Sequence, residues 1–547
     1  MNIRMPFFVG AAALLACSSV VADVERVMTL SDAYLLLPVK NGAAKRVLEI
    51  RADGKVLRKL DVEFAEGRPD WTAPVPVAGL RGRKVTLRLV GAPETYGAAL
   101  NAVKTVPVRP QGVDMKTEPL RPQLRFTQRY GWNNDPNGMT YYKGEWHLFF
   151  QNNPCGIQWG NMHWGHAVSK DLVHWTELDT ALAPDERGTM FSGSGVVDVD
   201  NVAGFGAGAH LLYYTAAGHP FTQCLAASTN GRTYEKWSRN PVLGNLSGGN
   251  RDPKVFWHAP SRHWVMVLYG FENNHHVFYV FNSADLTNWT KVQTLVGDAK
   301  DKGTWRYECP ELEELPIEGE RGTAWVLWGA GPLYDVGTFD GRTFTAVEER
   351  LAAWPLNLGT PYYAAQAFNN APDGRVIAIN WFKIGTGGAS TFGQGFSLPH
   401  ELTLRRTKDG LRLVRRPVRE LEALRAGPAV APEAFEGELA EAFLACTVGK
   451  NAHVSFDLRG VRVVYDAAKG TLSALGQSVA WPVANNRLAL RVFVDRNGME
   501  IFAQDGLQVF PVPAARPDPA NRRISVRMSV DADTPDFRVY PLKSIHP

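Results

Sequence analysis

The segment "SKDLVHW", Ser169 to Trp175, decides the fold because it returns in altered form at a regular distance along the chain. Related segments are "STNGRTYEKW" (Ser228 to Trp237), "SADLTNW" (Ser283 to Trp289) and "FDGRTF" (Phe339 to Phe344), and the starting serines are 59 and 55 residues apart. Such a period, filled by short strands and turns without helical periodicity, is typical of a β-propeller with one repeat per blade. We therefore predict a five-bladed β-propeller over residues 120–410.

The regions on either side of the repeats also have strand patterns. Before them, "KRVLEIRADGKVLRKLDVEF" alternates around an Asp-Gly turn, which predicts a small β-sandwich-like domain at 23–110. After them, "PVRELEALR" (Pro417 to Arg425) predicts a short helix at a linker, and strands return over 428–547. There, Asn497-Gly498 predicts a two-residue hairpin turn in a C-terminal β-sandwich. The predicted fold class is all-β.

The role of the N-terminal domain has two interpretations. It is either an accessory sugar-binding module or a brace that packs on the propeller. The connection "VPVRPQGVDMKTEPLRPQLRF" is stiffened by Pro110, Pro119 and Pro122 and contains little Gly or Ser. A stiff connection favours the brace.

The composition narrows the class of partner. The 547 residues exceed what one hydrophobic core usually serves. A formal net charge of +4 is too small over this length to indicate nucleic-acid binding. The 51 Gly, 35 Pro and 16 Trp indicate many turns and aromatic surfaces. This mixture suits a β-rich protein that binds flat, partly apolar molecules, of which sugars are the obvious class.

The N-terminus has the pattern of a secretory signal peptide over residues 1–22. Arg4 precedes an apolar run from Pro6 to Ala16 that is too short to span a bilayer permanently. Two processing sites stay open: a lipobox that would leave a lipid anchor on Cys17, and ordinary cleavage after Ala22. We expect a protein that is secreted, periplasmic or lipid-anchored at a bacterial cell surface, with no transmembrane span.

The cysteines and histidines indicate no metal site. Beyond Cys17 the chain has four scattered cysteines without a Cys-x-x-Cys pair, so neither a disulfide framework nor a zinc site is expected. His163 and His166 lie close in sequence, but no acidic or Cys partner is placed nearby. No cofactor is expected.

Three acidic residues stand in unusual settings: Asp135 in "WNNDPNG", Asp252 in "NRDPKV" and Glu308 in "RYECPEL". They are 117 and 56 residues apart, which corresponds to two blades and one blade. Each has a simpler interpretation, because Asp before Pro shapes turns and Glu is common at surfaces. Their common register nevertheless places them at like positions around one axis. Glycoside cleavage uses such a set, with a nucleophilic carboxylate and a carboxylic acid that protonates the leaving oxygen.

Several ordered segments resemble glycoside hydrolase family 32, the invertases, inulinases and levanases. "WNNDPNG" is similar to the family signature and departs from it only by Asn133, where Met is usual and where the change is expected to alter packing or polarity at the rim. The triplet Arg251-Asp252-Pro253 and the pair Glu308-Cys309 also match. Further matching segments are "FFQNNP" (Phe149 to Pro154), "WGNMHWGHAVSKDLVHW" (Trp159 to Trp175), "FSGS" (Phe191 to Ser194) and "INWF" (Ile379 to Phe382).

The resemblance implies a role for each matching residue. Asp135 would be the nucleophile, Glu308 the general acid/base, and Asp252 a stabiliser that binds fructose hydroxyls. The positions that would line the fructose pocket are Asn134, Gln151, Trp159, Ser192, Arg251 and Trp381. Trp132 is a further pocket candidate, whereas Trp164 and Trp175 sit inside the repeated strand pattern and are expected in the blade core.

The resemblance implies a retaining β-fructosidase that releases terminal fructosyl residues from fructans (levan or inulin) and from sucrose. "YECPELEEL" is closer to bacterial levanases and exo-inulinases than to plant invertases, since Glu311 stands where Asp is common. An endo-acting levanase or inulinase and a fructosyltransferase are alternatives. A non-catalytic fructan-binding propeller is disfavoured, because a lectin needs neither a nucleophile nor a separate proton donor.

Overall fold

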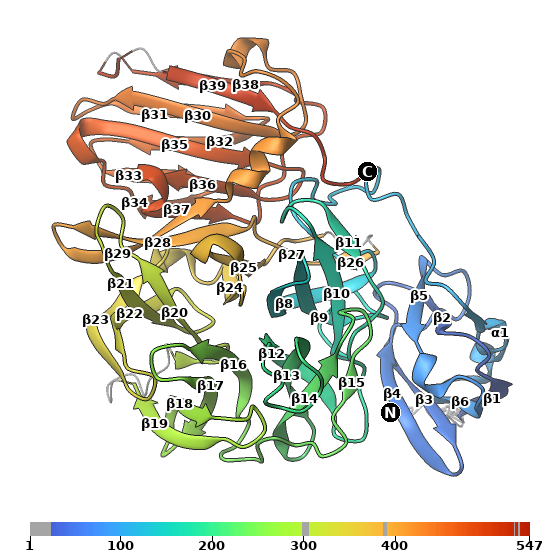
Figure 1. The fold of residues 1–547 in the computed structure, drawn as a ribbon. Helices are drawn as coiled ribbons and strands as arrows, with labels where there is room; N and C mark the ends of the chain where they lie inside the picture. The colour runs from blue at the N-terminus through green and yellow to red at the C-terminus, as the bar shows by residue number, and fades with distance from the viewer. Residues whose placement is uncertain (1–22, 298–305, 387–390, 530, 534–535) are drawn as a thin grey trace, which may run out of the picture.

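The structure, a computed structural model, describes residues 23–297, 306–386, 391–529, 531–533 and 536–547. The predicted signal peptide and Cys17 therefore lie outside the described residues. Strands dominate, and α1 (Gly97–Ala102) is the one α-helix in these ranges. Figure 1 shows three parts in chain order: a small N-terminal β unit in blue, a ring of sheets in green and yellow, and a C-terminal pair of sheets in orange and red.

The ring consists of five sheets, one per blade. From the innermost strand outward, the first blade contains β8 (Gly131–Tyr142), β9 (Glu145–Asn153), β10 (His163–Ser169) and β11 (Trp175–Glu177), and the second contains β12 (Thr189–Asp198), β13 (Ala209–Ala217), β14 (Phe221–Ser228) and β15 (Glu235–Lys236). The third contains β16 (Arg251–His258), β17 (His263–Glu272), β18 (His275–Ser283) and β19 (Thr290–Val296), and the fourth contains β20 (Glu311–Pro316), β21 (Thr323–Trp328), β22 (Leu333–Phe339) and β23 (Phe344–Ala352). The fifth contains β24 (Tyr362–Ala367), β25 (Val376–Phe382), β28 (His400–Thr407) and β29 (Gly410–Pro417). The ring is closed by β26 (Phe392–Gly393), which pairs in parallel with β8, and β27 (Gly395–Phe396) pairs with β25. The five-bladed propeller predicted from the repeat is confirmed.

The repeated segments all form the turn between the third and fourth strands of a blade. In the first blade the Asp171 carboxylate accepts backbone hydrogen bonds from Val173 and His174 at 3.0 and 2.8 Å. The residues that take its place in the next three blades are Asn230, Asp285 and Asp340, each accepting from the backbone two and three positions on. A side-chain oxygen that satisfies two backbone donors fixes a tight turn, which is why this pattern recurs once per blade.

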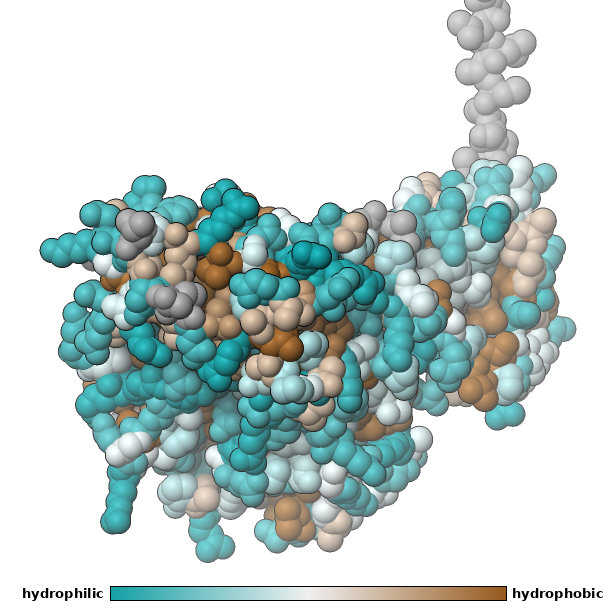
Figure 2. All heavy atoms as spheres, turned by 90° about the horizontal axis from the view of Figure 1, so that it is seen from above, coloured by the Kyte–Doolittle hydropathy of each residue, from teal (hydrophilic) through white to brown (hydrophobic). Residues whose placement is uncertain are grey.

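The N-terminal unit encloses its own apolar core between two sheets. One sheet has the order β1 (Val24–Thr29), β6 (Lys84–Val90), β3 (Arg46–Ala52) and β4 (Lys55–Val62), and the other has β5 (Trp71–Pro76), β2 (Tyr34–Val39) and β7 (Lys104–Val106). The Asp-Gly turn was predicted correctly: Asp53 and Gly54 join β3 to β4 with φ of 51° and 74°. Seen from above, this unit forms a lobe on the right of the molecule (Figure 2).

Three propeller residues, Tyr130, Cys155 and Ile157, belong to the apolar cluster of the N-terminal unit. The Trp71 ring stacks on the Tyr130 ring at a centroid distance of 6.0 Å. Separating the two parts would expose this shared apolar surface, at a cost of about 25 cal/mol for each Å². The packing therefore favours a brace over a freely tethered module.

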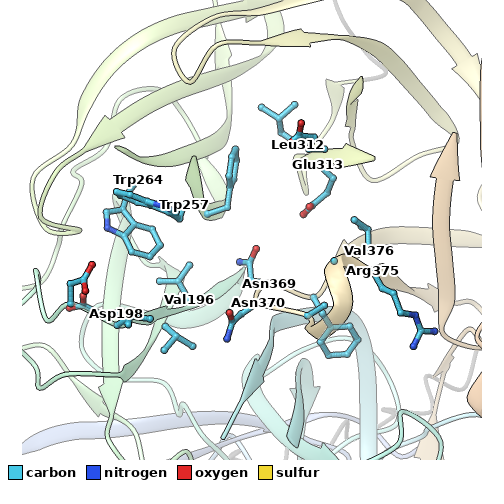
Figure 3. A pocket seen from close by; sticks show the side chains of 18 of the residues that line it. Val196, Asp198, Trp257, Trp264, Leu312, Glu313, Asn369, Asn370, Arg375 and Val376 are labelled. Atoms are coloured by element: carbon cyan, nitrogen blue, oxygen red, sulfur yellow. The ribbon is translucent and has the colours of Figure 1, made fainter. Parts of the chain in front are cut away.

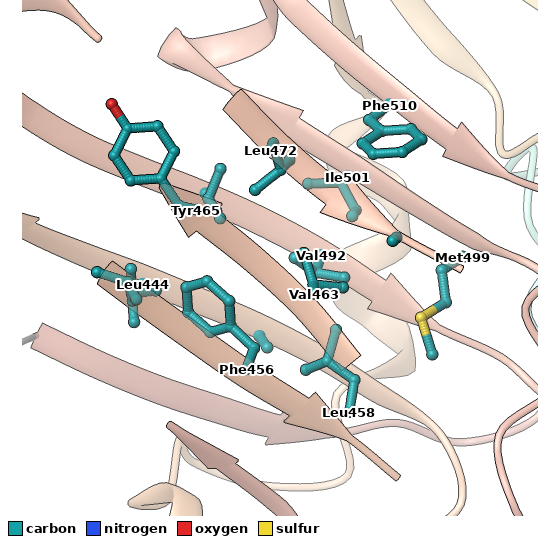
Figure 4. Packing of buried hydrophobic residues seen from close by; sticks show 14 of the residues in the cluster. Leu444, Phe456, Leu458, Val463, Tyr465, Leu472, Val492, Met499, Ile501 and Phe510 are labelled. Atoms are coloured by element: carbon teal, nitrogen blue, oxygen red, sulfur yellow. The ribbon is translucent and has the colours of Figure 1, made fainter. Parts of the chain in front are cut away.

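The C-terminal part is a β-sandwich of two five-stranded sheets. One sheet runs β37 (Gln508–Val512), β36 (Met499–Ala503), β35 (Arg487–Val494), β30 (Ala440–Thr447) and β39 (Asp536–Pro541), and the other runs β34 (Gln477–Ala480), β33 (Thr471–Ala474), β32 (Val461–Asp466), β31 (His453–Leu458) and β38 (Ile524–Met528). Figure 4 shows side chains such as Phe456, Val492 and Ile501 packed between the sheets.

Two local predictions in this part need correction. Val494 pairs with Met499, so the β35–β36 loop has four residues and the predicted two-residue turn was wrong. The Asp495 carboxylate accepts backbone bonds from Gln123 and Leu124 at 2.7 and 3.0 Å, so a contact with the propeller's first segment shapes this loop. The predicted linker helix is present as a 3-10 helix, η6 (Arg419–Leu424).

Candidate active site

The predicted acids lie at the same end of the propeller's innermost strands. Asp135 is in β8 and Asp252 in β16, while Glu308 lies just before β20. In four of the five blades the pairing of the innermost strand with its neighbour shifts register beside the site, at Asn133/Pro136, Phe191/Gly193, Arg251/Lys254 and Tyr363/Gln366. Bulges of this kind re-aim side chains. They explain how residues of a regular sheet point toward the propeller axis.

Asp135 is held by neighbours from three blades. Ser192 Oγ donates to Asp135 Oδ2 at 2.6 Å, and Cys309 Sγ lies 3.7 Å from the same oxygen. The Asn134 side chain also hydrogen-bonds to Asp135, and the Trp132 indole donates to Asn134 Oδ1 at 2.9 Å. These contacts fix the orientation of the carboxylate, which is half-buried.

Asp252 is near enough to the other two acids for their charges to act on it. Its Oδ2 accepts a hydrogen bond from the Cys309 backbone at 3.1 Å and lies 3.6 Å from Cys309 Sγ. Arg251 Nε is 3.7 Å from the same oxygen. Asp252 has φ of 64°, and its backbone N–H donates to Thr215 Oγ1 at 3.0 Å. Cys309 thus links Asp252 to Asp135.

Glu308 is held by a cation and a phenol. Arg251 donates to Glu308 Oε2 from Nε at 3.1 Å and from a terminal nitrogen at 2.9 Å. Tyr363 donates its hydroxyl to Glu308 Oε1 at 2.6 Å. Glu308, Cys309 and Ala364 have φ of 49°, 45° and 49°, a conformation that costs non-glycine residues free energy and clusters at functional sites.

The pKa values of two carboxyl groups in the site, Asp135 and Asp252, are raised above their ordinary value. Burial, together with the charge of Glu308, raises the pKa of Asp135. Burial raises the pKa of Asp252 to about 7, and the charges of Glu308 and Asp135 act in the same direction. The positive charge of Arg251 lowers this pKa but offsets only part of the rise. Near neutral pH Asp252 therefore carries a proton in a substantial fraction of the molecules. A site of this kind can combine a nucleophile with a proton donor.

Aromatic side chains form the rim. Trp381 lies edge-on to Trp132 at 5.9 Å and to Tyr363 at 5.9 Å. Trp159 is 55% exposed and packs edge-on against Phe191 at 6.0 Å. An exposed indole beside buried carboxylates is a common way to bind the apolar face of a sugar.

The remaining candidates lie further from the acids. Gln151 is buried in β9, and its side chain donates to the Met190 carbonyl at 2.9 Å. Met190 lies two residues before Ser192. Asn133 was predicted to act at the rim, but it is fully buried. When the Asn133 amide is oriented with Nδ2 toward Gln394 and Gly393, that nitrogen donates to their carbonyls at 3.2 and 3.3 Å. Its effect is therefore on packing beneath the rim.

Among the described residues, no group of three or more His, Cys, Asp and Glu could hold a metal ion. His163 and His166 are buried, and His166 Nε2 lies 3.0 Å from His147 Nδ1. In the same part of the chain, no helix has the length and apolar character that crossing a membrane requires.

A cavity of about 500 Å³ lies at the ends of the innermost strands opposite to those that hold the three acids. Figure 3 shows Trp257 and Trp264 on one side, Glu313 on another, and Asn369 and Asn370 between them. None of the three predicted acids lines this cavity. The three predicted acids therefore lie at the other end of the ring from this cavity.

Comparison with known proteins agrees with this geometry. A family described as "Glycosyl hydrolases family 32 N-terminal domain" matches residues 125–417, which is more than half of the chain. The chain belongs to glycoside hydrolase family 32. It is a glycoside hydrolase of the fructosidase type.

Named relatives are similar over about half to four fifths of the chain. A levanase of Bacillus subtilis (strain 168) is 33% identical over 488 residues, which cover 78% of this chain and 71% of the levanase. An extracellular exo-inulinase of Meyerozyma guilliermondii is 36% identical over 290 residues, 49% of this chain and 55% of that protein. A β-fructofuranosidase of Schwanniomyces occidentalis, complexed with fructosyl-erythritol, superposes with a TM-score of 0.68 at 25% identity and covers 79% of this chain and 99% of its own.

The family 32 site contains residues that the sequence did not single out. Tyr363 was missed because it lies between the quoted segments, and only its bond to Glu308 identifies it. Lys383 lies 4.1 Å from the centroid of the Tyr363 ring and 4.7 Å from that of Trp381, and burial lowers its pKa. Cys309 was recognised as part of a motif, but its contacts with both aspartates appear only in the structure.

We expect Tyr363→Phe to lower kcat/KM on sucrose by about 10- to 100-fold, because a hydrogen bond to a charged group contributes about 1.5–3 kcal/mol. The ring and its contacts with Trp381 stay, so the thermal unfolding midpoint should not change. Tyr307→Phe is the matched control, since the Tyr307 ring lies 5.3 Å from Arg251 and is 41% exposed. Equal effects of the two variants would contradict the role given to Tyr363.

We expect Asp252→Asn to be more resistant to heat than the wild type at about pH 8, by about 1–2 °C for each kcal/mol gained. The folded pKa of about 7 exceeds the unfolded value of about 3.9, so this group lowers stability as pH rises from about 4 to 7. At about pH 3 the side chain is mostly protonated in both states, and the advantage should vanish. Unfolding scans at the two pH values test this, and an equal shift at both would contradict it.

Proposed function

We propose that the protein is a retaining β-fructosidase that hydrolyses terminal fructosyl residues of fructans, levan or inulin, and of sucrose. The observation that carries the proposal is the separate anchoring of two carboxylates. Ser192 holds Asp135, whereas Arg251 and Tyr363 hold Glu308. Retaining glycosidases need such a pair, one as nucleophile and one as proton carrier.

In the first step, Asp135 attacks C2 of the fructosyl unit while the bond from C2 to the leaving oxygen breaks. Glu308 gives its proton to that oxygen, and the product is a covalent fructosyl-enzyme. In the second step, Glu308 takes a proton from water, whose oxygen attacks C2 and frees Asp135. Asp252 binds sugar hydroxyls and favours a positively charged transition state at the ring.

The substrate pocket would be lined by the residues around these acids. Arg251 and Ser192 already contact the catalytic carboxylates, and Asn134 supports Asp135. Trp381 and Trp159 would contact the apolar face of the sugar from the rim, with Gln151 behind them. The exposure of Trp159 suits a residue that a sugar covers on binding.

Relatives named levanase and exo-inulinase support a fructan as preferred substrate. Glu311, which favoured this choice in the sequence, is buried and lies 2.7 Å from Lys254 Nζ. It also lines a small cavity together with Ser192 and Asp252. An endo-acting mode and fructosyl transfer use the same chemistry at the donor site and stay as alternatives. A non-catalytic fructan-binding propeller would not require the proton donor held by Arg251 and Tyr363.

One product analysis tests the proposal. The enzyme is incubated with inulin, levan and sucrose in parallel, and products are followed by chromatography and early-time NMR. Free fructose released first in the β-furanose form supports a retaining exo-hydrolase. Initial oligosaccharides without fructose would favour the endo mode, and longer products from sucrose would favour transfer. No product from any substrate would contradict the enzyme assignment.

The location and domain limits are part of the same proposal. Relatives named extracellular exo-inulinases support secretion or placement in the periplasm, and a lipid anchor at Cys17 is the further option that the N-terminal sequence offers.

We propose domains at 23–110, 120–410 and 428–547. The sheets described above fall within these three ranges except for β29 of the last blade, which extends from 410 to 417.

A further inference from the structure

The loop 154–162, between β9 and β10, joins the substrate rim to the N-terminal unit. It carries Trp159, whose ring packs edge-on against Phe191 at 6.0 Å. Phe191 directly precedes Ser192, the residue that donates to Asp135. The position of this loop therefore decides where the exposed Trp159 indole stands relative to the catalytic carboxylates.

The same loop is anchored in the core of the N-terminal unit. Cys155 is fully buried, Ile157 is 9% exposed, and both belong to the unit's apolar cluster. Two residues of the loop thus take part in a core whose other members, apart from Tyr130, lie before the segment that matches family 32. The loop is therefore packed in the N-terminal unit as well as joined to the propeller.

A side-chain amide completes the connection at the edge of a sheet. The Asp61 backbone N–H donates to Asn161 Oδ1 at 2.8 Å, and Asn161 Nδ2 donates to the Asp61 carbonyl at 2.8 Å. β4 is an edge strand, and an edge strand presents unpaired backbone groups. The Asn161 amide therefore binds β4 as an additional strand would.

A chain of contacts leads from this amide to Trp159. Asn161 Nδ2 also donates to Asn153 Oδ1 at 3.1 Å. Asn153 Nδ2 in turn donates to the Gln158 carbonyl at 2.8 Å. Gln158 precedes Trp159 directly, so the main chain next to the indole is tied to Asp61 through two side-chain amides.

We propose that the N-terminal unit is a positioning element of the active site, which holds loop 154–162 at the Asp61 main chain and so orients Trp159 for the sugar. The inference rests on the proposed function, because it gives Trp159 a place in substrate binding. It goes further in assigning affinity for the fructosyl donor to a unit outside the catalytic propeller.

The test uses the full chain and removes one backbone donor far from the chemistry. Asp61→Pro deletes the N–H that Asn161 accepts, and proline is tolerated on edge strands. We expect KM for sucrose and inulin to rise about 3- to 10-fold with kcat within about 2-fold, because the lost interaction acts on binding. Purely structural damage would lower the unfolding midpoint without this division between KM and kcat.

Lys59→Pro is the matched control. Asp61 pairs with Val47 and Lys59 with Glu49 in the β3–β4 ladder. Alternate pairs of an antiparallel ladder have the same hydrogen-bonding type, so the Lys59 N–H also points outward, away from β3. The described bonds from the loop to β4 reach Asp61 and not Lys59. The control should therefore keep the wild-type KM.

A double-mutant cycle with Trp159→Ala tests the connection directly. If the loop acts through Trp159, Asp61→Pro should raise KM no further in the Trp159→Ala background. Additive effects would overturn the inference, as would a wild-type KM in Asp61→Pro. If Asp61→Pro fails to fold, Asn161→Gly breaks the same bonds from the propeller side and allows the φ of 46° at that position. A wild-type protein that releases no fructose would instead contradict the proposed function.

Discussion

Asp135→Asn should lower kcat on sucrose by about 10⁴-fold or more, because an amide oxygen does not form the covalent fructosyl-enzyme at a useful rate. The change is nearly isosteric. The Asn oxygen can still accept the hydrogen bond that Ser192 donates at 2.6 Å, and the bulge that aims the residue lies in the backbone. Fold and sugar binding should therefore survive while turnover is lost.

The measurement combines turnover with binding. Initial rates give the loss in kcat, and calorimetric titration with sucrose shows whether the pocket is still formed. Ser192→Ala is the matched control, since it removes the donor to Asp135 but leaves the nucleophile in place, and it should retain measurable turnover. Substantial activity in Asp135→Asn, free of wild-type contamination, would remove Asp135 from the mechanism.

The repeat was sufficient to predict the five-bladed ring, and the spacing of the acids placed them in its first, third and fourth blades. Turns such as the one at Asp171 are local, because one side-chain oxygen satisfies two nearby backbone donors. A feature that is stabilised within a few residues leaves a readable sequence pattern. The separation of Asp135, Asp252 and Glu308 then followed from counting blades.

Features that depend on distant partners could not be predicted. The four-residue loop after β35 is shaped by Asp495, which accepts from backbone groups at Gln123 and Leu124, more than 370 residues earlier. Tyr363 likewise acquires its role from Glu308, a residue of the preceding blade. Such contacts depend on closure of the ring, and no local pattern encodes them.

The burial of Asn133 shows the same limit at one position. Replacing an expected Met by Asn in a buried strand costs free energy unless the amide finds partners. Its partners are the carbonyls of Gly393 and Gln394, next to the segment that closes the propeller. The sequence showed the substitution but not the partners, and so placed it at the rim.

Glu308→Ala should reduce the hydrolysis of sucrose by about 10²- to 10⁴-fold, the usual contribution of general acid–base catalysis. The sugar leaving group needs a proton, and the variant cannot supply it. Glu308 has φ of 49°, so alanine occupies a conformation that is already strained in the wild type. Arg251 loses its partner but keeps the Asp252 carboxylate at 3.7 Å, which limits the structural effect.

The decisive comparison uses a donor that needs no proton. With β-fructofuranosyl fluoride the first step should be nearly unimpaired in Glu308→Ala, since fluoride leaves as an anion and needs no proton. The fructosyl-enzyme should then accumulate, because the variant has no base to activate water for the second step. Mass spectrometry would find one fructosyl unit on the peptide that holds Asp135. Azide, which needs no base, should then restore turnover and yield β-fructosyl azide. Equal losses on the fluoride and on sucrose would assign the proton transfer to another group, and the buried Asp252, with its pKa near 7, would be the first to examine.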